Sequence, residues 1–279
     1  MQAPFSDQEL AAFDAQGYLI REGFFFPEEM SLVQAEMRAG VKQLPYLLPG
    51  HRALISHPHL MAIMGQLCGP DFLFHHLNTY FQSQGTDGVA WHNDYEQVTV
   101  PMPRQHANII ALIYPDGLCG EVGDLVVMPG THRQVSAWGA YGFLGTQVLA
   151  GEVVIDRLAP GSVAFCHTGL VHCRRPKPGP GPRYFCDASY VARGPHWPAT
   201  SQHDWRHQYA ECLRQEQAHG RRFSHLFDAT QFFDYHLADR DIRDLGQDGI
   251  YRRLVTNPVA WDASHQGTPG NTTDGSRYA

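Results

Sequence analysis

Lysine is nearly absent from this chain. Its 21 basic residues are 19 arginines and two lysines, against 28 acidic residues, which gives a formal net charge of −7. This acidic balance disfavours binding to a phosphate backbone, so we expect no nucleic acid partner. The six cysteines form no C-x-x-C pair, which argues against a Cys-rich zinc framework and is typical of reduced thiols in a cytoplasmic protein.

Long apolar runs are also missing. The longest uncharged stretch, 134–151, contains four glycines together with Gln, Ser and Thr, and it is too polar to span a bilayer. The first nine residues lack the basic and apolar blocks of a secretory signal peptide. We therefore expect a cytoplasmic protein without a membrane segment. With 43% hydrophobic and 18% charged residues, its composition is that of an ordinary globular protein.

Helical signals flank a β-rich centre. Ser6 and Glu9 match a capping box, and Pro27 stands at a favourable first helical position. In the centre, short β-rich runs alternate with Gly, Pro and Asp turns, which indicates a sandwich or barrel rather than a doubly wound sheet. We expect one domain over residues 1–279, with N-terminal helices at about 6–67, a β core at about 72–195, a helical extension at about 200–260 and a flexible tail at about 262–279.

Histidine is the unusually frequent residue, with 17 copies. His92 and Asp94 stand two apart, so on an extended strand they point to the same side and can reach one ion. His172, expected to close the strand that follows the 160–161 turn, is the best third ligand. Two imidazoles and one carboxylate form a facial triad that suits Fe(II) and leaves one face open. Taken alone, the H-x-D pattern is equally compatible with a surface turn in which Asp94 caps a helix.

An arginine could anchor a cosubstrate beside that triad. Arg183 follows His172 by eleven residues, and the segment 173–182 between them contains four prolines and two glycines, so it is expected to be a loop. An arginine at the start of the next strand can bind a carboxylate through a planar, two-pronged contact. The alternative is an ordinary surface arginine at a strand edge.

Four stretches together resemble the phytanoyl-CoA dioxygenase family of Fe(II)/2-oxoglutarate oxygenases. They are His92-x-Asp94, the run EVGDLVVMPGTH at 121–132 (family pattern E-N-G-x-L-x-x-x-P-G-S-H), the run from Leu158 through PGSVAF to His172, and Arg183 at the family's spacing from the distal histidine. The opening FDAQGY at 13–18 also resembles the family's F-x-x-x-G-Y. The resemblance covers roughly residues 10–195. The chain departs from the family at Asn93, where Gln is common, and at Val122, where Asn is usual.

The resemblance implies a fold that is mainly β with flanking helices. This is a double-stranded β-helix, or cupin-like jelly roll, with the metal at its open mouth. It implies that His92, Asp94 and His172 bind Fe(II), and that Arg183 pairs with the far carboxylate of 2-oxoglutarate. With O2 as the other cosubstrate, the implied reaction hydroxylates an unactivated C–H bond of a small molecule and yields succinate and CO2. Related halogenases carry a small residue in place of Asp94, so halogenation is not expected.

The remaining contacts are less well defined by the sequence. The stretch 81–84 lacks the Lys that often makes a second contact to 2-oxoglutarate, and Asn108 is our candidate for that contact. For Trp91, packing in the core is an equal alternative to substrate contact. Arg174 and Arg175 could meet an anionic substrate, with solvated charge as the default. Substrate contacts are predicted for residues beside the metal ligands and after the Pro-Gly-Thr-His turn, namely Trp91, Tyr95, Glu96, Arg133 and Trp138.

Several alternative functions stay open. The same iron chemistry could give demethylation, desaturation or cyclisation in natural-product biosynthesis, because only substrate placement differs. A non-oxidative cupin-like metal protein would not bind 2-oxoglutarate and would not need Arg183. A protein oxygenase would need an extended groove, and the net charge opposes a nucleic acid substrate. The acidic balance and the shortage of lysine mildly disfavour a CoA ester, and both a monomer and a homodimer remain open.

Overall fold

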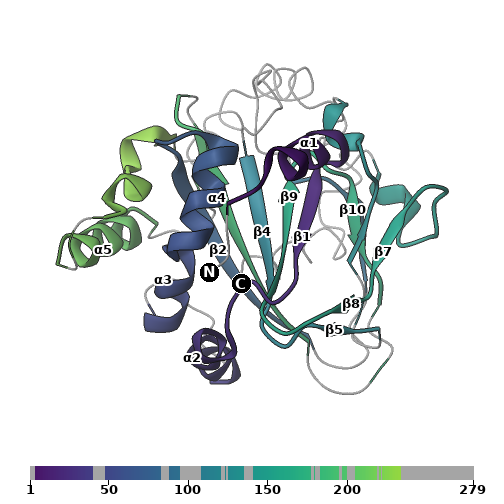
Figure 1. The fold of residues 1–279 in the computed structure, drawn as a ribbon, viewed down its shortest axis with the longest axis horizontal. Helices are drawn as coiled ribbons and strands as arrows, with labels where there is room; N and C mark the ends of the chain where they lie inside the picture. Colours follow the sequence, from purple (N-terminus) through teal and green to yellow (C-terminus); the bar gives the residue numbers. More distant parts are fainter. Residues whose placement is uncertain are drawn as a thin grey trace, which may run out of the picture.

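Two antiparallel sheets face each other in the centre of the molecule, with helices packed outside one of them (Figure 1). This is the arrangement in the computed structural model, which describes residues 4–39, 48–82, 88–94, 108–120, 123, 125–134, 141–176, 179, 183–194, 197–199, 205–218, 220 and 222–233. The predicted tail at 262–279 therefore lies outside the described residues. Among those described, no helix is long and apolar enough to cross a membrane.

The larger sheet has five strands. Its order is β1 (Tyr18–Arg21), β9 (Ser162–His167), β4 (Asn108–Tyr114), β11 (Arg183–Val191) and β2 (Leu73–Gln82). Every neighbouring pair is antiparallel. The first strand pairs with β9, from Tyr18 opposite Cys166 to Arg21 opposite Val163.

The smaller sheet has four strands. Its order is β3 (Val89–His92), β10 (His172–Arg174), β6 (Leu125–Val127) and β7 (Val153–Ile155), again antiparallel throughout. Two short pairs complete the strands: antiparallel β5 (Leu118–Cys119) with β8 (Arg157–Leu158), and parallel β12 (Trp197–Pro198) with β13 (Phe232–Phe233). Two facing antiparallel sheets confirm the predicted jelly roll.

The helices begin where the sequence supplies caps. In α1 (Asp7–Gln16), Ser6 and Glu9 form the reciprocal capping box, and Gly17 ends the helix with φ of 83°. Each of the next three helices starts with proline at its first position, where the missing N–H costs no hydrogen bond. They are α2 (Pro27–Arg38), α3 (Pro49–Ile55) and α4 (Pro58–Cys68).

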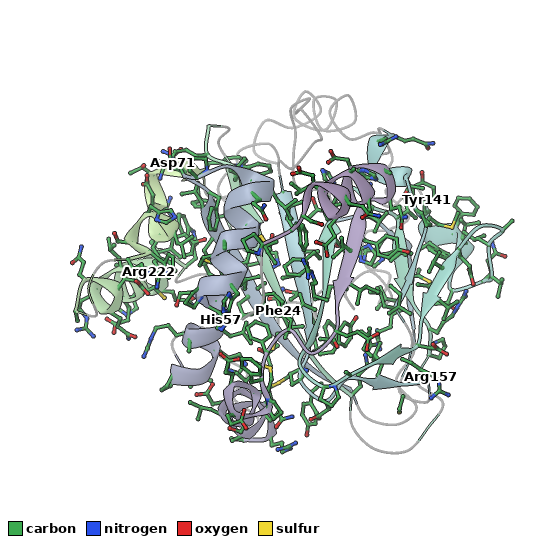
Figure 2. All side chains as sticks on the ribbon, viewed as in Figure 1. Phe24, His57, Asp71, Tyr141, Arg157 and Arg222 are labelled. Carbon is green, nitrogen blue, oxygen red and sulfur yellow. The ribbon has the colours of Figure 1, made fainter. Side chains whose placement is uncertain are left out.

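The helices cover the outer face of the five-stranded sheet. In Figure 1, α3 and α4 run along that face, and α4 contacts β4 and β11. In Figure 2, Phe24 and His57 lie together in this layer, with ring centroids 6.2 Å apart. The predicted C-terminal helix is α5 (Trp205–Ala218), whose buried Tyr209 hydroxyl lies 2.7 Å from the carbonyl oxygens of both Phe74 and His75. Short 3-10 turns occur at η3 (Thr131–Arg133), η4 (Gly142–Leu144), η5 (Ser224–Phe227) and η6 (Ala229–Gln231).

The central strand β4 separates two cores. All seven of its residues are buried, because the strand is covered on both faces. Alternate residues (Ile109, Ala111 and Ile113) belong to the core beneath the helices. The others (Ile110, Leu112 and Tyr114) belong to a second core between the sheets, together with Leu125 and Val127 of β6. Side chains of this second set point into the barrel, and the candidate site is built on that face.

Candidate metal centre

Three potential metal ligands converge between β3 and β10. The Nε2 atoms of His92 and His172 lie 3.6 Å from Oδ1 and Oδ2 of Asp94, respectively. The three ligand atoms are all within 4.8 Å of one another, and each residue is partly buried. The structure thus brings together the three residues that the sequence selected.

Strand pairing places the two histidines side by side. His172 is directly opposite His92 in the β10–β3 pair, and their ring centroids are 4.2 Å apart. The sequence had predicted that His172 closes the strand after the 160–161 turn, and this was wrong. That strand, β9, ends at His167, where a tight turn with a Leu170 N–H to His167 carbonyl hydrogen bond carries the chain to the other sheet. His172 therefore begins β10.

Backbone contacts aim the ligand atoms. The Nδ1 atoms of His92 and His172 lie 2.7 Å and 3.0 Å from the carbonyl oxygens of Ala90 and Leu170, two residues earlier in each case. With the proton on Nδ1, the lone pair of each ring is on Nε2 and faces Asp94. The Asp94 N–H donates to the Thr168 carbonyl at 2.8 Å, which fixes the third candidate ligand to the turn that follows β9.

This donor set fits a divalent transition metal. The nitrogen–oxygen separations of 3.6 Å are too long for hydrogen bonds, yet both imidazoles face the same carboxylate. Two neutral imidazoles and one carboxylate on one side of an ion form the facial arrangement typical of non-haem Fe(II) oxygenases, with the remaining positions open.

The barrel interior has two ends with different chemistry. At one end, which we call the mouth, the Asn108 carbonyl accepts from Thr168 N–H at 3.2 Å, and Thr168 in turn holds Asp94. At the other end, the floor, Tyr114 and Arg183 meet. The mouth is the end nearest α1 in Figure 1, and β5 and β8 lie at the opposite end. The three candidate metal ligands are therefore at the mouth.

Arg183 is enclosed at the floor. The residue is only 3% exposed, and its guanidinium lies over the rings of Phe185 and Tyr114, with centroid distances of 5.0 Å and 5.5 Å. Its Nη2 is 3.4 Å from the Tyr114 hydroxyl, whereas Nε and Nη1 are buried without a hydrogen-bond partner among the described residues. Burial raises the pKa of the Tyr114 hydroxyl, and the Arg183 charge acts in the opposite direction.

Such a buried cation fits an anionic ligand. A charged group removed from water is unfavourable unless an opposite charge or several hydrogen bonds compensate it. Either of these buried groups of Arg183, Nε or Nη1, can pair with Nη2 to form the planar fork that binds one carboxylate. The same face of the barrel thus offers a cationic floor suited to a carboxylate and a mouth with three candidate metal ligands.

Asn108 does not lie beside Arg183. It begins β4, whereas Tyr114, which contacts Arg183, ends it. The Asn108 Oδ1 accepts from Ser189 Oγ at 2.9 Å, and Asn108 is buried at the mouth. The structure therefore places Asn108 at the opposite end of β4 from the Arg183 contact, and a contact of Asn108 to 2-oxoglutarate stays a prediction.

Two predicted substrate residues have other contacts. Trp91 is fully buried on the outer side of β3, among Val126, Val171 and Cys173, and its indole N–H donates to the Gln147 carbonyl. Trp91 therefore packs in the core, which was the alternative to substrate contact. Side chains alternate along β3, so the strand that turns His92 inward turns Trp91 outward. The exposed Arg133 donates from Nε and Nη2 to the Asp14 carbonyl. The remaining three, Tyr95, Glu96 and Trp138, lie outside the described residues.

Sequence reasoning missed several polar residues on the inner face. His76 Nε2 lies 3.5 Å from Asp187 Oδ1, which also accepts from the Asn78 N–H at 3.2 Å. With Ser189, they line the mouth side of β2 and β11, since Ser189 is paired with both Ile110 and His76. A signal was present: polar residues at alternate positions of otherwise apolar strands.

The sequence of this chain is similar to that of one characterised enzyme. No family model matches the chain. An ectoine dioxygenase from Nocardia farcinica (strain IFM 10152) is 27% identical over 157 residues, which are 45% of this chain and 51% of the relative. The chain thus matches about half the length of that curated relative.

Several solved structures have a fold similar to that of this chain. The non-haem α-ketoglutarate-dependent carbocyclase SnoK from nogalamycin biosynthesis superposes with a TM-score of 0.59 at 16% identity, over 73% of this chain and 92% of that one. HygX from Streptomyces hygroscopicus, with nickel and 2-oxoglutarate bound, gives a TM-score of 0.58 at 16% identity, over 68% and 88%. These similarities confirm the jelly-roll fold and agree with the family resemblance in the sequence.

Proposed function

We propose that this protein is an Fe(II)/2-oxoglutarate-dependent dioxygenase that hydroxylates a C–H bond of a small molecule. The single observation that carries the proposal is the pairing of the His92–Asp94–His172 cluster with a buried, incompletely hydrogen-bonded Arg183 inside one barrel. The similarity to an ectoine dioxygenase supports it, as does the similarity to a HygX structure that contains nickel and 2-oxoglutarate. The proposed reaction converts substrate, 2-oxoglutarate and O2 into hydroxylated substrate, succinate and CO2.

In this proposal the two ends of the barrel have separate tasks. Bound at the mouth, Fe(II) would supply O2 activation coupled to the oxidative decarboxylation of 2-oxoglutarate. His92, Asp94 and His172 would hold the metal on one face, and the carbonyls of Ala90 and Leu170 keep both Nε2 atoms directed at it. Arg183 would bind the far carboxylate of the cosubstrate and so orient its other end toward the metal.

The primary substrate would enter at the mouth. His76, Asp187 and Ser189 provide polar groups on the larger sheet across from the metal ligands. The apolar residues directly opposite Ser189 and Asp187 on β4, Ile110 and Leu112, would help to exclude water from the reacting centre. We further propose a soluble cytoplasmic enzyme formed as one domain, with no nucleic acid partner. Predicted substrate contacts of Tyr95, Glu96 and Trp138 stay predictions.

The decisive test is anaerobic visible absorption of the metal-free protein, titrated first with Fe(II) and then with 2-oxoglutarate. We expect a metal-to-ligand charge-transfer band that is lost in His172→Ala and weakened in Arg183→Ala. Iron binding without a band would instead support a cupin-like metal protein. A positive result leads to a screen for substrates by succinate release, with product analysis by mass to separate hydroxylation from demethylation, desaturation and cyclisation.

A further inference from the structure

Two residues of opposite charge face the barrel interior from β11. Alternate residues of a strand share one face, and Asp187 is paired with Leu112 of the core between the sheets. Arg183 is on the same face and lies at the floor, where it contacts Tyr114. The inward-facing positions of β11, in order from floor to mouth, are therefore Arg183, Phe185, Asp187 and Ser189.

An aromatic pair lies between the two charges. The rings of Phe185 and Tyr80 are stacked with centroids 4.5 Å apart, and the Arg183 guanidinium lies over the Phe185 ring at 5.0 Å. Tyr80 is directly opposite Phe185 in the β11–β2 pair, so this aromatic layer spans both strands. Among the described residues, Asp187 therefore contacts His76 and not Arg183.

One oxygen of the Asp187 carboxylate accounts for its contacts within the described part of the chain. Oδ1 accepts from the Asn78 N–H at 3.2 Å and lies 3.5 Å from His76 Nε2, at the outer limit of a hydrogen bond. No described group forms a hydrogen bond with Oδ2. The Asp187 side chain is 11% exposed, so a ligand in the barrel can reach the carboxylate.

A β-bulge places polar side chains beside this carboxylate. The β11–β2 register shifts after Ser189, whose partner is His76, and leaves His75 as an extra residue of β2. His75 is buried, and its Nδ1 is 3.0 Å from Nδ1 of His76. Bulges redirect side chains and often occur next to active sites. The contact with the buried His75 holds the His76 ring next to Asp187.

An inward-facing carboxylate is best compensated by a cation. Removing a negative charge from water is costly unless an opposite charge or several hydrogen bonds compensate it. Asp187 has one backbone donor and one distant imidazole, and a hydrogen bond from a charged donor is about twice as strong as a neutral one. An anionic ligand would be repelled at the same position. The floor of the barrel thus suits an anion, and the level of Asp187 suits a cation.

We propose that Asp187 determines substrate specificity, and that the primary substrate carries a protonated amino group that donates to Asp187 Oδ2. This inference rests on the proposed function and deepens it by naming the substrate class. The two ligands would then be separated by charge, with the cosubstrate carboxylate at Arg183 and the amino group of the substrate at Asp187. Binding of the amino group would fix which C–H bond of the substrate faces the metal centre.

The experiment compares amines with alcohols of the same carbon skeleton. The pairs are putrescine and 1,4-butanediol, cyclohexylamine and cyclohexanol, and 2-phenylethylamine and 2-phenylethanol. Anaerobic isothermal titration calorimetry measures their binding to the protein loaded with Fe(II) and 2-oxoglutarate. The charge-transfer band, recorded on the same samples, shows whether an amine displaces the cosubstrate from iron.

Two variants remove one negative charge each. Asp187→Asn keeps the shape of the side chain and an oxygen that can accept from the Asn78 N–H. Asp71→Asn, at an exposed position labelled in Figure 2, changes the net charge equally and is the matched control. Circular dichroism confirms that both variants are folded. If Asp187→Asn does not fold, the comparison of amines with alcohols in the wild type still tests the proposal.

We expect at least one amine to bind the wild type about tenfold or more tightly than its alcohol, as a charge-assisted hydrogen bond provides. Asp187→Asn should reduce this preference to within about twofold, whereas Asp71→Asn should retain it. A purely structural role of Asp187 would instead weaken amine and alcohol alike.

The proposal is overturned if the wild type prefers no amine over its alcohol, or if the preference persists in Asp187→Asn. Either result leaves the proposed function standing, provided that the wild type shows the charge-transfer band with Fe(II) and 2-oxoglutarate before any amine is added. If that band is absent, the proposed function itself has failed.

Discussion

His172 lies directly opposite His92 in the antiparallel β10–β3 pair, with the two ring centroids 4.2 Å apart. Two residues that are 80 positions apart in the chain are thus fixed by backbone pairing rather than by contact between their side chains. Because a carbonyl two residues earlier in its own strand orients each ring, contacts within the protein direct both Nε2 atoms toward Asp94.

Asp94 supplies the only negative charge among these three ligands, so its removal should have the largest effect on metal binding. Loss of a residue that hydrogen-bonds to a metal ligand typically lowers metal affinity by about 10–100-fold. We expect Asp94→Ala, which removes a ligand itself, to lower Fe(II) affinity by at least that much and to abolish hydroxylation. Equilibrium dialysis with Fe(II) under anaerobic conditions measures the first effect, and succinate release the second. Asp71→Ala, at an exposed position labelled in Figure 2, is the control. Undiminished turnover in Asp94→Ala would remove Asp94 from the ligand set.

The ligand cluster could be predicted from the sequence because each ligand belongs to a short local pattern. The i, i+2 spacing of His92 and Asp94 determines the shared face, and the motif that ends at His172 supplies the third residue. Arg183 was identified through its position at the start of the next strand. The strand that His172 belongs to was predicted incorrectly, since the break between β9 and β10 depends on a turn whose bonds the sequence does not reveal.

Depth within the barrel was not predictable. Asn108 and Tyr114 belong to one apolar strand, and only the register with β11 and β9 shows that one lies at the mouth and the other at the floor. Trp91 is a different case, because its outward orientation follows from strand alternation once His92 is taken to face inward.

Tyr114 orients the floor arginine, so its hydroxyl should affect cosubstrate binding without affecting the metal. Tyr114→Phe keeps the ring beneath the guanidinium and removes the atom 3.4 Å from Arg183 Nη2. We expect the dissociation constant for 2-oxoglutarate to rise by about two- to tenfold, which corresponds to one hydrogen bond, at unchanged Fe(II) affinity. Anaerobic titration of the charge-transfer band measures both constants. A variant with wild-type affinity for 2-oxoglutarate would contradict an orienting role.

The helical layer should make stability depend on pH below neutrality. Burial lowers the pKa of His51 between α2 and α3, and Glu36, whose Oε2 is 2.7 Å from His51 Nδ1, opposes that shift without cancelling it. Burial likewise lowers the pKa of His57 despite its contact with Glu29. The folded state then binds fewer protons than the unfolded state as pH falls below about 6.5, so acid favours unfolding.

We therefore expect the contribution of these two histidines to the free energy of unfolding to be constant above about pH 6.5. As the pH is lowered, the free energy of unfolding should decrease by at most about 1.4 kcal/mol per pH unit for each group. Urea denaturation of the metal-free protein between neutral and mildly acidic pH measures the slope. His51→Gln should flatten it, whereas His207→Gln, at an exposed position on α5, should not. Parallel slopes for wild type and His51→Gln would show that His51 contributes nothing to the pH dependence.

Gly17 joins the end of α1 to the turn beside the metal centre. Its φ of 83° is in the left-handed region, its carbonyl accepts from the His167 N–H at 2.8 Å, and a Cβ here would overlap the His132 ring. Gly151 has nearly the same φ, 85°, but open space around it. Gly17→Ala should thus lose stability through backbone strain of about 1–2 kcal/mol and through an additional packing penalty. Gly151→Ala should lose stability through the strain alone. Chemical denaturation of the two variants measures the difference, and equal losses would mean that the His132 ring moves aside at no cost.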